Sequence, residues 1–305
     1  MFIKLLAAIF VAAAILHATT GASLTDETQD NESLAKSARY GHNDYVRNWN
    51  QDDIDDEYDV YDLPKLAFAL NKINKGDSQF FKKMVKLQIY LYKLFNDNND
   101  VNHEYVFNVA YYFSKIKNDA FYAKLSSSTK SLLNDYIDNY LPPSAKTLFF
   151  DNSFRLMNRE YDDKYLYTSN EKIDSARHYV FLSTKDNFNQ NGKSEWTTTL
   201  KDASTNRHTN LKFTLQSVKT KHYAYVERNS YKGHRNLLAS WNSSDKPSNA
   251  DWTVTLYQDQ LIFSQNGRVI CASDLLKSDS RRYVHGEDEN GEAVAACQWF
   301  AKECP

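Results

Sequence analysis

Three short segments in the second half of the chain resemble one another, and this repeat constrains the fold more than any other feature. Residues 177–182, 221–226 and 267–272 each begin near a basic residue and continue as a short apolar or aromatic run. A tryptophan preceded by Glu, Asp or Gln follows each segment. Because three repeats of four short strands build a β-trefoil, we predict that fold, with a β-sandwich as the alternative. The predicted inner anchors of the three repeats are Trp196, Trp252 and Trp299.

The periodicity of the apolar residues changes near residue 158. Up to that point apolar residues recur at helical spacing, which predicts a small all-α bundle over 61–157. The expected helices cover 62–76, 78–95, 102–116, 120–125, 128–141 and 145–157. Beyond that point, short runs of β-branched and aromatic residues predict at least ten strands. We therefore expect an α+β protein of two domains, an N-terminal all-α helical bundle followed by a C-terminal β-trefoil over 158–305, each with its own core.

The first 60 residues predict a signal peptide that is removed and a polar segment that is exposed to solvent. Residues 1–22 resemble a secretory signal peptide, because Lys4 precedes an apolar run over 5–16 that is followed by small residues. That run is too short to span a bilayer, so we expect no integral membrane segment. Residues 23–60 form an acidic polar lead-in, and the acidic run over 52–62 lacks the glycine that a calcium loop needs, so we expect no metal site there.

Composition and motifs argue against several classes of protein. Only 8 glycines are present; Gly286 and Gly291 have the spacing of a phosphate-binding loop, but Glu292 follows them and acidic residues lie between them, so no cofactor is expected. The net charge of -2 does not favour binding to nucleic acid. The sequence contains neither a Gly-x-Ser-x-Gly nor a His-Glu-x-x-His motif. We therefore predict a non-enzymatic binding protein, with a hydrolase using paired carboxylates as the distant alternative.

Few residues are candidates for a ligand site or a modification. Trp241 and Tyr231 lie beside polar segments and are the predicted ligand-contacting rings. Two of the three cysteines, Cys271, Cys297 and Cys304, are expected to form one disulfide, and the sequence does not choose the pair. Asn31 and Asn242 begin N-glycosylation sequons.

The segment between the helices and the first strand carries a resemblance to a known family. It reads Phe154-Arg155-Leu156, then Asn158-Arg159-Glu160-Tyr161. With the leader, the helical part and the strand repeat, it resembles the low-molecular-weight lipoproteins of lepidopteran haemolymph and eggs. The run at 256–261 departs from the repeated Asn-Arg-Glu-Tyr-like pattern of that family, which indicates a divergent member.

The resemblance implies a secreted haemolymph storage or carrier protein that binds lipid or carbohydrate without covalent chemistry. The alternative is a binding protein for a secreted signalling peptide or an immune partner. The acidic helical half favours this alternative, because acidic residues attract a basic peptide.

Overall fold

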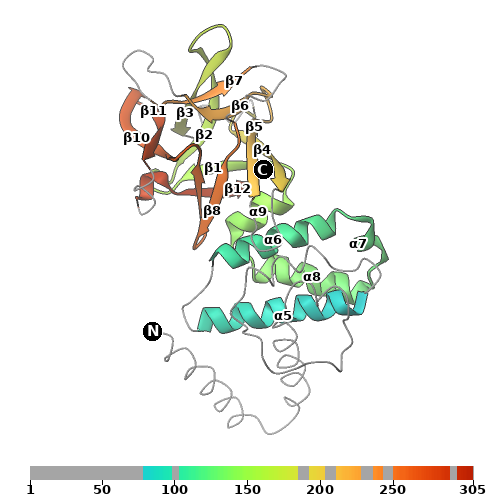
Figure 1. Ribbon diagram of the computed structural model, residues 1–305. Coiled ribbons are helices and arrows are strands. Elements are labelled where there is room, and N and C mark those ends of the chain that lie inside the picture. The colour runs from blue at the N-terminus through green and yellow to red at the C-terminus, as the bar shows by residue number, and fades with distance from the viewer. Residues whose placement is uncertain are drawn as a thin grey trace.

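The structure is a computed structural model, and it describes residues 78–97, 103–184, 192–202, 211–227, 236–242, 250–288 and 294–304. The predicted signal peptide, the acidic lead-in and the first expected helix lie outside these residues. The helices are α5 (Ser78–Asp97), α6 (His103–Lys117), α7 (Ala120–Lys124), α8 (Ser127–Asn139) and α9 (Pro143–Phe150). The part of the chain from Phe154 onwards is built of strands (Figure 1).

Within the described residues, twelve strands follow the helices in sequence and belong to one antiparallel sheet. They are β1 (Phe154–Asn158), β2 (Lys164–Lys172), β3 (Arg177–Thr184), β4 (Glu195–Asp202), β5 (Leu211–Ser217), β6 (Tyr223–Val226), β7 (Leu238–Trp241), β8 (Thr253–Tyr257), β9 (Gln260–Ser264), β10 (Arg268–Ser278), β11 (Arg281–Asp288) and β12 (Trp299–Glu303). A 3-10 turn, η4 (Ala295–Cys297), precedes β12.

The pairing of the strands closes a ring. β1 pairs with β4 and β12, β4 pairs with β5, and β9 pairs with β8 and β12. A bridge between Phe213 and Trp252 joins β5 to β8 and completes the ring. The hairpins β2–β3, β6–β7 and β10–β11 are joined to one another through β3, which pairs with both β7 and β11.

The predicted division into an N-terminal all-α bundle and a C-terminal β-trefoil is wrong. The dominant element is the 12-stranded antiparallel sheet, and the described helices do not form a bundle with a core of their own. Buried side chains of the helices and of the strands belong to one continuous hydrophobic cluster. Helical periodicity shows that one face of a helix is buried, but not which element buries it. The sequence pattern could therefore not show that the helices share the core of the sheet.

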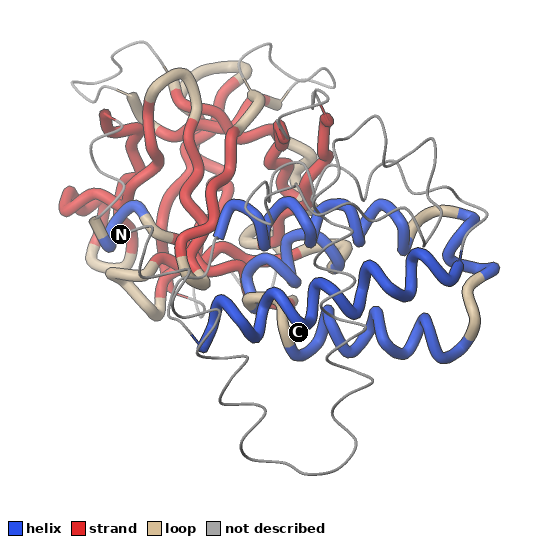
Figure 2. Tube along the Cα trace, turned by 60° about the horizontal axis from the view of Figure 1, so that its bottom comes forward, coloured by secondary structure: helices blue, strands red, loops and turns tan. Residues whose placement is uncertain are grey.

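Three phenylalanines form one of the contacts between the helices and the sheet. The ring centroid of Phe107 on α6 lies 4.8 Å from that of Phe149 on α9 and 6.0 Å from that of Phe213 on β5. Phe149 and Phe213 lie 5.9 Å apart. Figure 2 shows the helices gathered on one side of the strands. Because Phe107 and Phe149 belong to helices and Phe213 belongs to a strand, these ring contacts join the two layers.

The last expected helix, over 145–157, is also wrong in its second half. Helix α9 ends at Phe150, and strand β1 begins at Phe154. Phe154 pairs with Trp196 on one side and with Glu303 on the other. Both partners are distant in sequence, so a local pattern of apolar residues could not distinguish this strand from a continued helix.

The beginning of α9 depends on the sheet as well. Its first residues follow Pro142, whose side chain makes no capping hydrogen bond. The main-chain N–H of Ser144 instead donates to Oδ1 of Asp259, 2.7 Å away in the turn between β8 and β9. The hydroxyl of Ser144 accepts a hydrogen bond from the N–H of Ala301 on β12, 3.2 Å away. A helix N-terminus needs such acceptors, and here a distant turn supplies one.

Candidate functional site

The three predicted anchor tryptophans occupy equivalent buried positions in the sheet. Trp196, Trp252 and Trp299 are each 0% exposed. Their indole N–H groups donate to the main-chain oxygens of Leu166, Ala224 and Ile270, at 2.9, 3.1 and 3.0 Å respectively. A buried indole N–H needs a partner, and each repeat supplies the same one. These tryptophans are parts of the core and do not face a ligand.

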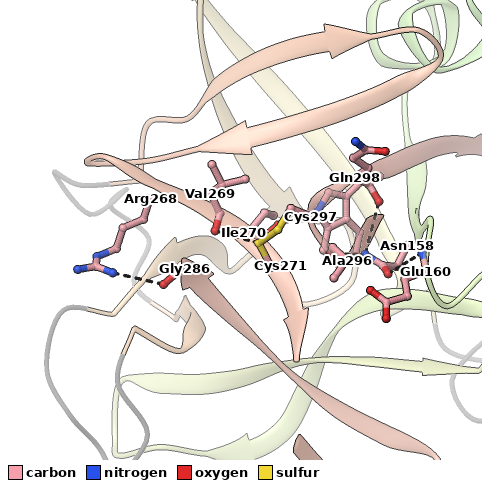
Figure 3. The surroundings of a disulfide bond; sticks show 11 residues. Asn158, Glu160, Arg268, Val269, Ile270, Cys271, Gly286, Ala296, Cys297 and Gln298 are labelled. Carbon is pink, nitrogen blue, oxygen red and sulfur yellow. Dashed lines mark hydrogen bonds between the residues drawn. A yellow bond between two sulfur atoms is a disulfide. The ribbon is translucent and has the colours of Figure 1, made fainter. Parts of the chain in front are cut away.

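The disulfide joins Cys271 to Cys297 and leaves Cys304 as a free thiol (Figure 3). Cys271 directly follows the carbonyl that accepts from Trp299, and Cys297 lies two residues before that tryptophan. In the first two repeats these places hold Tyr167 with Ser194, and Tyr225 with Ala250, all of them buried. The third repeat therefore has a covalent bond where the others pack a tyrosine ring. Such a bond stabilises the fold and is not a site of chemistry.

Trp241, a predicted ligand-contacting ring, lies on β7 and is only partly buried. It packs edge-on against Tyr225, with 6.4 Å between the ring centroids, and it pairs across the sheet with Arg177 and Tyr223. Asn242 follows it in the chain and is exposed. Its side-chain amide donates to the main-chain oxygen of Ser175. The second predicted ring, Tyr231, and the first sequon, Asn31, lie outside the described residues.

The structure contains a cleft that the sequence did not reveal. It measures about 640 Å³ and lies between helices α6 and α9 and the hairpin β4–β5. Figure 1 shows that α9 and α6 lie next to the labelled end of that hairpin. The twelve lining residues come from all four elements and from the connection after α9: Tyr111, Ser114, Lys115, Asn118, Leu148, Phe149, Asp151, Asn152, Thr197, Thr198, Leu200 and Phe213.

One wall of the cleft is apolar and rigid. Tyr111, Leu148 and Phe213 contribute to it while remaining at most 4% exposed. Phe149 is partly exposed and is held from behind by Phe107 and Phe213, with which it forms the contact between the layers. Aromatic rings fixed in this way offer apolar area to a ligand with little loss of side-chain entropy.

The other wall is polar, and its most informative atom is Oδ2 of Asp151. That oxygen is buried and has no hydrogen-bond partner among the described residues. Burial raises the pKa of the Asp151 carboxyl, and the nearby Glu303 raises it further. A hydrogen bond from Thr147 and the charges of Lys146 and Lys117 act in the opposite direction. An acceptor that is shielded from solvent and unsatisfied is a site where a ligand donor gains a strong hydrogen bond.

The remaining polar residues set the electrostatics of the cleft. The Lys115 ammonium lies 5.3 Å from the centroid of the Tyr111 ring, and the Ser114 hydroxyl donates to the main-chain oxygen of Tyr111 over 2.7 Å. Asn118, Asn152 and Thr197 add amide and hydroxyl groups. The lining thus contains one basic and one acidic residue, so the cleft does not select strongly for the net charge of a ligand.

Little in the sequence indicates this cleft. Its residues come from four separate segments, and most of them fit an ordinary helix or strand pattern. The one local indication is a break in the apolar pattern between α9 and β1. Short polar residues interrupt the pattern there, at Asp151, Asn152 and Ser153. No group of three or more His, Cys, Asp or Glu side chains that could hold a metal ion occurs among the described residues.

Comparisons with known proteins show distant likenesses only. No family model matches the sequence, and no curated protein matches it. A Cysteine and Tryptophan-Rich salivary protein from Culex covers 50% of this chain and 94% of its own length, at 15% identity and a TM-score of 0.38. A Caenorhabditis elegans protein of unknown function covers 50% of this chain and 94% of its own, at 14% identity and a TM-score of 0.40. The SDF2-like protein from Arabidopsis thaliana covers 50% of this chain and 92% of its own length, at 14% identity and a TM-score of 0.38.

At these identities and TM-scores, neither the fold nor the function of this chain follows from the likeness. The sequence predicts no integral membrane segment, and the helices of the structure can be compared with this prediction. Within the described residues, no helix is both long enough and apolar enough to cross a bilayer.

Proposed function

We propose that this chain is a secreted, non-enzymatic binding protein that carries a ligand non-covalently in the cleft between α6, α9 and the hairpin β4–β5. One observation carries the proposal: a buried carboxylate oxygen without a partner, at Asp151, lies in the same cleft as the fixed rings of Tyr111, Phe149 and Phe213. A few polar groups beside an apolar wall are typical of ligand sites.

The size of the cleft supports a carrier role. Small-molecule sites usually measure roughly 300–1,000 Å³, and this cleft measures about 640 Å³. The sequence predicts lipid or carbohydrate as the ligand, with a secreted peptide as the alternative. Each of these presents both apolar surface and hydrogen-bond donors, so the lining is compatible with all three classes.

Secretion and the relation to lepidopteran haemolymph lipoproteins are part of the same proposal. They rest on the apolar leader over 1–22 and on the sequence between Phe154 and Tyr161. A storage role in haemolymph would use the same fold without any ligand. Organic extraction of the protein from its native fluid, followed by mass spectrometry, separates storage alone from carriage.

The cleft is tested with a panel of three probes on the full chain: oleate, maltotriose and a displayed library of random heptapeptides. We expect at least one probe to bind, and Phe149→Ala to weaken that binding about tenfold. Tyr257→Ala is the matched control, because Tyr257 is 48% exposed and is not part of the cleft lining. The proposal is contradicted if no probe binds, or if a probe binds Phe149→Ala as well as it binds Tyr257→Ala. Turnover of p-nitrophenyl esters or glycosides that Asp151→Asn abolishes contradicts its non-enzymatic part.

A further inference from the structure

The cleft covers one face of the β4–β5 hairpin, where Leu200 pairs with Phe213, and it also reaches the edge of strand β4. Thr197, Thr198 and Leu200 all belong to its lining. Successive side chains of a strand point to opposite faces of the sheet, so a cleft over one face would be lined by alternate residues only. Because the neighbours Thr197 and Thr198 both line it, the cleft reaches the main chain between them.

Among the described residues, no strand pairs with that edge of β4 beyond Trp196, because the chain that precedes β1 turns away from it. β4 pairs with β5 from Trp196↔Ser217 to Asp202↔Leu211. On its other side β4 pairs with β1 only through Glu195 and Trp196. Continued in register, the chain before β1 would place Asn152 opposite Thr198. Asn152 and Asp151 instead line the cleft, where the chain turns into α9. The chain before Phe154 and strand β4 after Trp196 therefore diverge, and the cleft lies between these two segments.

The orientation of the main chain adds a second observation. The N–H of Thr199 donates to Oγ1 of Thr214 on β5, 3.2 Å away, so it points toward β5. In an antiparallel ladder the N–H and C=O groups of successive residues alternate between the two neighbours. The donors and acceptors of Thr198 and Leu200 therefore point toward the cleft. Two residues with this spacing form the repeating unit to which another strand binds.

We infer that the occupant of the cleft is an extended peptide segment of a partner protein, which adds to the edge of β4 as a further strand. This inference rests on the proposed function and names the class of ligand. An acyl chain would cover the N–H and C=O groups of Thr198 and Leu200 without satisfying them, which is unfavourable. A peptide strand satisfies both, and it directs alternate side chains to the two sides of the added strand.

The walls of the cleft match the two sides of such a strand. The partly exposed ring of Phe149 is placed to contact an apolar side chain of the peptide. Asp151 also lines the cleft, and its Oδ2 is buried and without a partner among the described residues, so a peptide N–H that reached this oxygen would gain an acceptor. The aromatic wall and the unsatisfied carboxylate thereby acquire distinct roles in one binding mode.

The decisive variant is Thr198→Pro, because proline removes the N–H that faces the cleft and leaves the ladder with β5 intact. The probe is a biotinylated heptapeptide selected from a displayed random library on the full chain and then synthesised. We expect Thr198→Pro to weaken its binding at least tenfold. Thr198→Ala restores the N–H, and we expect it to recover most of the affinity. Circular dichroism and thermal unfolding check that both variants fold.

Hydrogen exchange on the unmodified protein provides a measurement that does not depend on a variant. We expect the peptide to slow the exchange of the Thr198 and Leu200 amides, while the amide of Thr199 is protected already in the free protein. Strand addition is overturned if selection yields no peptide, or if the bound peptide leaves those two amides exchanging as before. Binding of oleate or maltotriose that Phe149→Ala weakens would then preserve the carrier function and reject only the peptide.

Discussion

The indole Nε1 of Trp196 donates a hydrogen bond to the main-chain oxygen of Leu166 over 2.9 Å, across a sequence separation of 30 residues. Trp252 makes the same bond to Ala224 across 28 residues, and Trp299 makes it to Ile270 across 29. Three buried indoles with one type of partner at nearly equal separation define the internal symmetry of the sheet. This symmetry suggests which substitutions the fold tolerates least.

We expect Trp252→Phe to lower the free energy of unfolding by about 2–4 kcal/mol. The substitution leaves the buried oxygen of Ala224 without its donor and opens a cavity where the larger ring lay. Trp241→Phe serves as the control, because Trp241 is only partly buried, and we expect a loss of about 1 kcal/mol or less. Urea unfolding followed by circular dichroism measures both values. Equal losses in the two variants would contradict the role of Trp252 as an anchor.

The disulfide is expected to stabilise the third repeat. Cys271 and Cys297 are 26 residues apart, and closing a loop of that length lowers the entropy of the unfolded chain by an amount worth about 3–4 kcal/mol. We expect the double variant Cys271→Ala with Cys297→Ala to lose stability of that order. Chemical denaturation under non-reducing conditions measures the loss. Cys304→Ala removes the free thiol and is the matched control, for which we expect a much smaller change.

The stability of the protein is expected to depend on pH through His222. Burial, followed by the neighbouring His178, lowers the pKa of His222 to about 4 from its ordinary value of 6.5. The ring centroids of the two histidines lie 4.7 Å apart. Between these pH values the unfolded chain binds a proton at this position and the folded chain does not. Stability is therefore fully present above pH 6.5 and falls as the pH decreases toward 4.

His222→Gln tests the origin of that dependence, because glutamine does not titrate. We expect the melting temperature of this variant to decrease less between pH 7 and pH 4.5 than that of the unmodified protein. His103→Gln is a useful comparison, since burial also lowers the pKa of His103 but no charged neighbour contributes to that shift. An unchanged pH profile in His222→Gln would show that other groups cause the acid sensitivity.

Asp151 is expected to favour binding at the expense of stability. Because its carboxyl has a raised pKa in the folded state, ionisation at neutral pH opposes folding. We expect Asp151→Asn to raise the melting temperature slightly at pH 7, or to leave it unchanged, while weakening the ligand about tenfold through loss of the charged acceptor. Differential scanning calorimetry with and without ligand measures both effects. A marked decrease in melting temperature would indicate that Asp151 is structural instead.

Much of the local structure could be predicted from periodicity. Short runs of β-branched and aromatic residues predicted strands in the second half, and β6 (Tyr223–Val226) and β9 (Gln260–Ser264) are such runs. The strands β1 and β11 were not predicted, because their partners are distant and their own residues do not alternate clearly. The first turn of α8 also differs from expectation. The helix was expected over 128–141, but it begins at Ser127, and Ser126 caps it by accepting from the N–H of Thr129.

The sequence alone determined that the helices have an apolar face and where three equivalent tryptophans recur, because periodicity and repetition can be read along the chain. It did not determine the full set of buried residues, since α6 is buried on all sides from Tyr105 to Ser114. Tertiary structure decided which cysteines pair, how the helices join the core of the sheet, and where the cleft lies. Each of these depends on contacts between distant segments. β1 pairs with β4 at Phe154 and Trp196, and the residues before Phe154 do not continue this pairing. Where the pairing stops determines how much of the edge of β4 is left without a neighbouring strand. The residues before β1 cannot pair with β4, because they belong to α9 and to the short connection after it. No local sequence pattern shows this arrangement.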